Sequence, residues 1–295
     1  YYFGDTWRAG ASAAISIGVR YQPSPAPNEV HGRSRFPYGC DCNNLAPYFG
    51  LAYSPPGWRG TLRAGYGLQY GSVLPVTYGL IRFAPPENIR RVIQQPDLVS
   101  LFTGAYGGTS GVTDRLSLYR LDGRLVQPYA HLYSLSWEPQ VSRKWRLQLS
   151  YAGSRTFKLV QMWYLNRAAV SPSGTTANVD DRRPDPRYSE IRYLLSTSRA
   201  WYDAARVTLL IPRWRGLSAE TSYWYGKALD LGANYSDTGN IRHQWRNQWE
   251  YESHADLKGL TDFDQPHALL ARFSFDTPRL AAQNRWLRGL AGGWN

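Results

Sequence analysis

Three clusters of residues in this chain combine side chains that bind metal ions. The first consists of Asp262, Asp264 and His267, spaced D-x-D-x-x-H, and several divalent metals accept two carboxylates together with an imidazole. The competing interpretation is that these residues cap the start of a strand. We favour the capping role for this cluster.

The other two clusters mix acidic residues with basic ones. One places three aspartates among three arginines: Asp180, Asp181, Asp185, Arg182, Arg183 and Arg187. A calcium loop would need better-ordered oxygen ligands and fewer cations, so we interpret this cluster as a solvated loop. The other, interpreted as loop surface, contains His243, Glu250, Glu252 and His254.

The two cysteines, Cys40 and Cys42, form a C-x-C pair within a polar stretch. A zinc site would need two more ligands at suitable spacing, and His31 is the one candidate nearby. We expect a local disulfide formed in an oxidising compartment, while two free thiols stay an alternative.

Motifs of known catalytic chemistry are missing from the sequence. It has no nucleophile elbow, P-loop, dinucleotide fingerprint or zinc-protease helix. We therefore expect no enzymatic activity, no metal and no cofactor.

The regular alternation of apolar and polar residues is the strongest structural signal. In residues 11–21, Ile15, Ile17 and Val19 share one face, while Ser16, Gly18 and Arg20 share the other. This period of two is typical of a strand with chemically different faces. The sequence therefore predicts β-strands that separate an apolar from a polar environment.

Five pairs of such strands follow one another along the chain. We place them at 1–6 and 11–21, 45–53 and 61–71, 129–137 and 145–153, 201–211 and 217–226, and 267–277 with a partner starting near Trp286. Short turns join the strands of a pair, and long polar connections (22–44, 72–128, 154–200 and 227–266) separate the pairs, with a short helix expected around 86–95. Short turns on one side and long loops on the other are typical of an outer-membrane β-barrel.

The composition agrees with a membrane barrel. Aromatic residues make up 15% of the chain, including 22 Tyr and 12 Trp, and such rings suit membrane interfaces. The mean hydropathy of −0.48 is compatible with strands that alternate. No apolar run is long enough for a transmembrane helix.

The net charge of +12 comes mostly from arginine. Basic chains with interleaved aromatic residues can bind nucleic acid, but these arginines occur singly on polar faces and in loops. We therefore expect no nucleic-acid partner, and assign the arginines to a barrel lumen and to anionic lipid headgroups.

Six motifs, in order, resemble the barrel of the Oar-like class of TonB-dependent transporters. They are NLAP with FGLAY (44–53), LRAGYG (62–67), PYAHLYSLSW with LSYAGSR (128–155), YWYGKALD (223–230), DFDQPH (262–267) and RWLRGLAGGW (285–294). The resemblance implies an all-β, antiparallel transmembrane barrel of roughly 22 strands, filled by a plug domain. It also implies the bacterial outer membrane as location, and as partners the TonB system, outer-membrane lipid and lipopolysaccharide.

About ten strands of such a barrel are present, so we expect residues 1–295 to form part of one barrel domain. Neither a plug nor a TonB-interaction segment is recognisable, and the chain starts within a predicted strand and ends in Asn295 rather than an aromatic residue. We expect a piece of a longer polypeptide.

The resemblance implies uptake of a solute through the barrel, with polar side chains in the lumen contacting the plug or the solute. The predicted lumen-facing set is Arg20, Arg63, Gln69, Arg146, Gln148, Arg206, Glu220 and Arg272. A structural alternative is a charge ladder lining a polar interior, and the basic bias favours an anionic solute or plug surface. Two other functions stay open: a non-transporting surface or adhesion barrel, and a soluble secreted β-rich protein that binds glycans.

Overall fold

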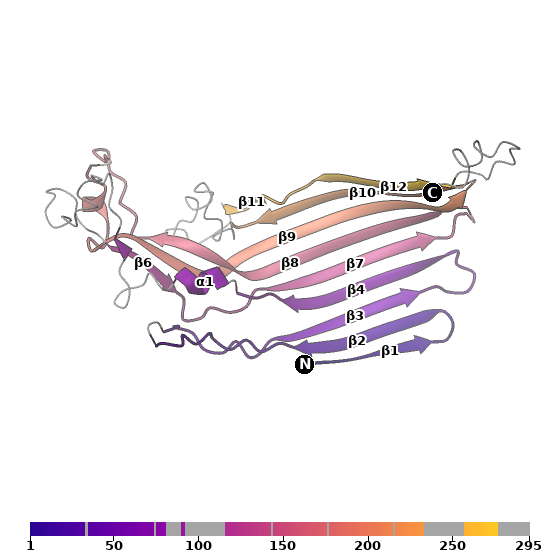
Figure 1. Cartoon of the computed structure of the whole chain (residues 1–295), viewed down its shortest axis with the longest axis horizontal. Coiled ribbons are helices and arrows are strands. Elements are labelled where there is room, and N and C mark those ends of the chain that lie inside the picture. The colour runs from indigo at the N-terminus through magenta and orange to yellow at the C-terminus, as the bar shows by residue number, and fades with distance from the viewer. Residues whose placement is uncertain are drawn as a thin grey trace, which may run out of the picture.

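The chain folds as one large sheet of mostly antiparallel strands (Figure 1). The computed structural model describes residues 1–32, 35–73, 75–80, 90–91, 116–142, 144–175, 177–214, 216–232 and 257–276. The strands are β1 (Tyr2–Ala9), β2 (Ala13–Tyr21), β3 (Leu45–Tyr53), β4 (Gly60–Tyr70), β5 (Arg90–Arg91), β6 (Leu116–Leu121), β7 (Tyr129–Pro139), β8 (Arg146–Leu165), β9 (Tyr188–Trp214), β10 (Leu217–Asp230), β11 (Gly259–Leu260) and β12 (His267–Phe275). A short helix α1 (Pro75–Leu80) and a 3-10 turn (Asp180–Arg182) complete the described elements.

The long strands form an up-and-down meander. Their order is β1-β2-β3-β4-β7-β8-β9-β10, with β11 and β12 both paired to β10. Tight turns join the two strands of each pair at one end of the sheet, and the long connections between pairs lie at the other end (Figure 1). Gly10 and Gly57 in two of these turns have positive φ angles of 66° and 84°, which glycine adopts without steric cost. The predicted alternation of short turns and long connections is therefore confirmed.

The two faces of the sheet differ as the sequence predicts. On one face the side chains of Leu135, Val207 and Phe273 are 48%, 45% and 77% exposed, with no protein layer above them in the described part of the chain. A soluble sheet would bury such side chains, whereas a barrel strand turns them toward lipid. The architecture is that of an antiparallel transmembrane β-barrel whose sheet is open.

Glycine residues make room for an aromatic ring on the polar face. The ring of Tyr48 lies over β2, where a Cβ atom added to Gly18 would come within 2.4 Å of the ring. A Cβ atom on Gly4 would come within 2.1 Å of the Tyr48 hydroxyl. The small residues on this face therefore leave space for a large side chain from a neighbouring strand.

Two strands are much longer than the sequence analysis predicts. β8 continues to Leu165 and β9 begins at Tyr188, so much of the predicted connection 154–200 is sheet. The register shifts between Thr156, Leu159 and Val160, and Lys158 has a φ of 61°. This bulge breaks the period of two, which is why the alternation did not predict the extension.

The extensions form a folded unit at the long-loop end, which we call the loop-end annex: α1, β6, residues 157–165 of β8 and residues 188–199 of β9. β6 pairs with β9 in parallel. A buried cluster holds the unit together, and it contains Val73, Tyr119, Leu121, Leu125, Val160, Met162 and Leu194. Leu194 is fully buried, so the annex has a core of its own.

Other sequence expectations lie partly outside the described residues. Of the helix predicted around 86–95, Arg90–Arg91 is described and forms β5, so the helix is wrong there. The strand predicted from Trp286 lies beyond the described part of the chain. In the described part, no helix is long and apolar enough to cross a membrane.

Candidate functional site

The strand register places all eight predicted lumen residues on the same face of the sheet. Ser136 lies between Arg63 and Ser150, and Ser150 lies opposite Arg206. Counting by twos along each strand from this row reaches the other members of the set. They share one face because their strands pair without a shift in this part of the sheet.

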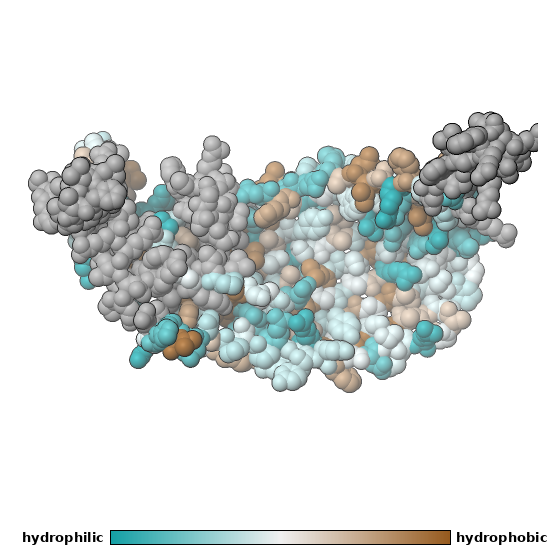
Figure 2. Space-filling view, viewed as in Figure 1, coloured by the Kyte–Doolittle hydropathy of each residue, from teal (hydrophilic) through white to brown (hydrophobic). Residues whose placement is uncertain are grey.

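Figure 2 shows one face of the sheet, on which hydrophilic and intermediate residues cover most of the strands and strongly hydrophobic ones are scattered. Two hollows lie on the face that carries the eight residues. The first, with a volume of about 410 Å³, is lined by Arg63, Gln148 and Arg206. The second, of about 600 Å³, is lined by Arg20 and Gln69.

The remaining three residues of the set lie outside both hollows. Glu220 and Arg272 form an ion pair across β10 and β12, with 2.6 Å between Oε2 and Nη2. Arg146, at the turn end, lies opposite Leu210 in the register. The polar set thus divides into two hollows, one ion pair and one separate arginine.

The first hollow contains hydrogen-bonding groups without a partner in the described structure. The Arg206 guanidinium lies over the Trp224 ring, 5.6 Å from its centroid, while its Nε is buried and unpaired. The Ser150 hydroxyl opposite is also buried and unpaired. An unpaired buried donor costs free energy that a bound acceptor recovers, so the hollow suits an anionic or carbonyl-bearing group.

The second hollow is more aromatic. Tyr48 and Tyr70 line it beside Arg20 and Gln69, and Tyr1 and Tyr2 close it at the edge of the sheet. Flat rings with single polar groups are common in sites that hold organic ligands. The sequence analysis predicted the two polar residues of this hollow and missed Tyr48, since alternation alone does not show which ring the neighbouring glycines accommodate.

The D-x-D-x-x-H residues behave differently from a metal site. Asp264 Oδ1 accepts a hydrogen bond of 2.7 Å from the backbone N–H of Ala228, and His267 Nδ1 lies 2.8 Å from the Tyr223 hydroxyl. Asp264 therefore binds the backbone near the end of β10, whereas the predicted capping role was at the start of the strand that follows, β12. Within the described residues, no three His, Cys, Asp or Glu side chains gather as metal ligands, and the His243 cluster lies outside them.

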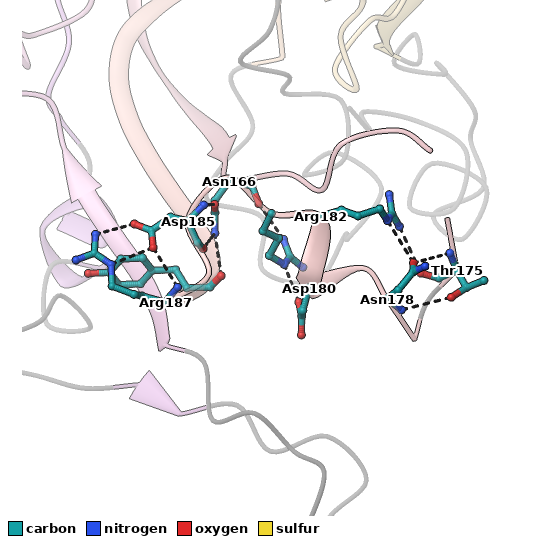
Figure 3. Close-up of polar contacts among 9 residues, drawn as sticks. Asn166, Thr175, Asn178, Asp180, Arg182, Asp185 and Arg187 are labelled. Carbon is teal, nitrogen blue, oxygen red and sulfur yellow. Dashed lines mark hydrogen bonds and ion pairs between the residues drawn. The ribbon is translucent and has the colours of Figure 1, made fainter. Parts of the chain in front are cut away.

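The aspartate–arginine cluster at 180–187 is a braced loop whose charged side chains are half-exposed or exposed, as expected of a solvated loop (Figure 3). Asp180 pairs with Arg183 and Asp185 pairs with Arg187, each at 2.7 Å. Asn166, which is 5% exposed, accepts from the Asp185 N–H and donates to the Asp185 carbonyl. Hydrogen bonds from Arg187 hold the pKa of the Asp185 carboxyl below its usual value. Asp180 and Asp185 are therefore each neutralised by an arginine of the same loop.

Hydrogen bonds also join the end of the connection 22–44 to the end of the connection 72–128. Cys40 and Cys42 are disulfide-bonded, and Asp41 between them accepts the Gln127 N–H at 2.7 Å. Asn44, which is 2% exposed, donates to the Gln127 side chain at 3.0 Å. We call these contacts the Asp41–Asn44–Gln127 clasp. Sequence reasoning missed it because the partners lie more than eighty residues apart.

The meander, the lipid-type face and the polar face define a barrel of the outer-membrane class. The chain belongs to the family described as the outer membrane beta barrel domain, whose profile matches residues 34–295. Its location is the bacterial outer membrane.

Solved structures with a similar fold include three outer-membrane proteins. The siderophore receptor PirA from Pseudomonas aeruginosa is 12% identical over 78% of this chain and 35% of its own, with a TM-score of 0.42. The outer membrane transporter YddB from Escherichia coli is 14% identical over 78% and 24%, with a TM-score of 0.47. The ferric enterobactin receptor PfeA from Pseudomonas aeruginosa is 15% identical over 78% and 29%, with a TM-score of 0.45.

This chain spans between 24% and 35% of the length of these structures. No curated protein matches it.

Proposed function

We propose that this chain is part of the barrel of a TonB-dependent outer-membrane transporter or receptor of the Oar-like type. Residues 1–295 belong to one barrel domain, and the plug domain and TonB-interaction segment lie elsewhere in the full-length protein. The proposal has the support of the six ordered motifs, and it assigns no enzymatic role to the chain.

The observation that carries the proposal is the hollow around Arg206. Arg206, with its buried and unpaired Nε, and Ser150, with its buried and unpaired hydroxyl, both line this hollow. Arg63 adds a second positive charge to the lining. A barrel whose interior only had to be filled would pair such groups with each other. On our proposal, the eight polar residues line the lumen, and this hollow contacts an anionic solute or an acidic plug surface.

Accumulation of solutes in cells tests this proposal even while the solute is unidentified. Metabolites of wild-type and gene-deletion strains are compared by mass spectrometry, with and without an uncoupler of the proton-motive force. We expect an anionic solute whose accumulation needs both the gene and the force, and which the Arg206→Gln variant of the intact protein takes up less. Arg59→Gln, in the turn that precedes β4, is the matched control.

The loop-end annex favours a second candidate function, that of a non-transporting surface or adhesion barrel. A long loop region with its own core is suited to presenting a binding surface. This function predicts cells that bind a partner through the annex and show the same solute accumulation with and without the gene. That result would overturn the transport proposal.

A further inference from the structure

A cluster of charged side chains lies on the apolar face of the sheet. Arg155 and Asp203 form an ion pair at 2.9 Å, and the Tyr151 hydroxyl donates to Asp203 at 2.5 Å. Asp203 precedes Val207 by four residues in β9, so the two side chains lie on the same face of the sheet. Charges on a lipid-facing surface are costly at the bilayer midplane and much less so near its boundary, so the height of this cluster matters.

The cluster lies at the outer boundary of the apolar band. Asp203 precedes Trp214, at the turn end of β9, by eleven residues, which is about 36 Å along a strand. With a tilt of about 40° this length gives a height of about 28 Å, close to the apolar band of an outer-membrane barrel. The opposite end carries the short turns, which face the periplasm. Asp203 and Arg155 are therefore level with the headgroups of the outer leaflet.

Three more cations surround this pair, and two of them lie over aromatic rings. Lys227 lies opposite Asp203 in the register. The Lys258 ammonium lies 4.4 Å from the centroid of the Trp201 ring, and Trp201 is opposite Arg155. The guanidinium of Arg199 lies over the ring of Phe157 at 5.6 Å.

These four cations, Arg155, Arg199, Lys227 and Lys258, form what we call the cationic belt. On this face of β7 to β10, Asp203 is the one carboxylate among the described residues, and Arg155 already pairs with it. Lys227, Lys258 and Arg199 are exposed, and no ion pair joins them to a described carboxylate. Counting the described residues alone, the belt therefore carries an uncompensated positive charge at the level of the lipid headgroups.

We propose that the cationic belt binds the phosphates of lipopolysaccharide in the outer leaflet. Phosphate groups on a glucosamine headgroup are anionic at this level of the membrane, while the acyl chains below would contact the apolar rows beginning at Ala205 and Val207. Tyr133 and Tyr151 supply flat rings between the two regions, as is usual at a membrane interface. This site is on the outside of the barrel and is independent of the solute and of transport.

The test measures binding of bisphosphorylated lipid A to the intact protein in detergent, by native mass spectrometry. The Lys227→Gln/Lys258→Gln double variant removes two exposed charges of the belt and leaves the Arg155–Asp203 pair in place. We expect its affinity for the lipid to fall about thirtyfold, since each basic residue near an anionic surface contributes to binding. Arg59→Gln/Lys144→Gln removes the same charge at the turn end and should bind as the wild type does.

Lipid A without phosphates and free inorganic phosphate complete the experiment. The dephosphorylated lipid should bind the wild type and the belt variant equally, and inorganic phosphate in excess should leave the bound lipid in place. Equal binding of bisphosphorylated lipid A to the wild type and the belt variant would overturn the proposal, as would equal losses in belt and control variants. Displacement by inorganic phosphate would overturn it too, by showing an anion site without a lipid role.

Discussion

Leu149 and Gln148 are neighbours in β8 whose side chains lie on opposite faces of the sheet. The register places Leu149 beside Trp137 and Val207, and Gln148 beside Thr208. Leu149 is 36% exposed on the apolar face, whereas Gln148 lines a hollow on the polar face. Each residue therefore reports on the environment of one face.

We predict that Leu149→Arg lowers the free energy of unfolding of the intact protein by roughly 2–4 kcal/mol, the cost of a charge on a lipid face near the midplane. Gln148→Arg should cost much less, because the arginine enters a polar interior. Urea unfolding in lipid vesicles measures both values. Equal or reversed costs would show that our assignment of the faces is wrong.

A substitution at Gly18 tests whether this position must be a glycine. We predict that Gly18→Ala destabilises the protein by about 1–3 kcal/mol, because the new Cβ would overlap the Tyr48 ring and force it to move. Gly50→Ala, on the same face of β3, is the control, since its Cβ would make an ordinary contact of 3.6 Å with Ser16. Urea unfolding compares the two, and equal stabilities would contradict the packing of Tyr48.

The pH dependence of the braced loop follows from the Asp185–Arg187 pair. A carboxyl whose pKa is lowered in the folded loop stabilises it above the ordinary value of 3.8, and this contribution is lost as the pH falls through the lowered pKa. We predict that the protection of the amides within 166–187, measured relative to their intrinsic exchange rates, falls below pH 3.8, and that Asp185→Asn removes most of this dependence. Hydrogen-exchange mass spectrometry at a series of pH values makes the measurement. A profile unchanged in Asp185→Asn would assign the effect to another group.

At the scale of elements, the clasp determines how two connections are held over the barrel. We predict that Asn44→Ala leaves the Gln127 side-chain carbonyl without its donor, at a cost of about 1–3 kcal/mol to the local structure. Limited proteolysis within 22–44 should become faster while the strands stay protected. Asn43→Ala, at an exposed neighbouring position, should cleave at the wild-type rate, and equal acceleration in both variants would contradict the clasp.

The sequence predicted the strands well where apolar and polar residues alternate without interruption. The strands from β2 to β4 alternate apolar and polar or small residues, so their faces and approximate ends were predicted, as was the common face of Arg63 and Arg206. The extensions of β8 and β9 were not, because the bulge near Lys158 interrupts the alternation and the annex buries residues of both parities, such as Gln161 and Met162. The hollow at Arg206 could not be predicted, because its lining comes from several strands and the sequence of each strand does not show which residues of the next strand it pairs with.

At the scale of the whole molecule, the apolar band sets the membrane in which the protein is most stable. The band ends near Asp203 and Trp214, about 28 Å apart in height. We predict that the free energy of unfolding is highest in bilayers of about that hydrophobic thickness and falls by fractions of a kcal/mol for each ångström of mismatch. Vesicles of lipids with increasing chain length measure this, and a stability independent of thickness would contradict the assigned band.

The extended β8–β9 hairpin also projects from the barrel at the end that carries the long connections (Figure 1). From Thr156 to Leu165 the hairpin continues for about 30 Å beyond the last row of the regular barrel register, and the braced loop with its paired aspartates and arginines forms its tip. A bacteriophage or an antibody is too large to enter a barrel, so it can contact only the surface outside the lumen. Among the described residues the loop 166–187 is part of that surface (Figure 1), and substitutions there change what such an agent would contact without touching the barrel interior.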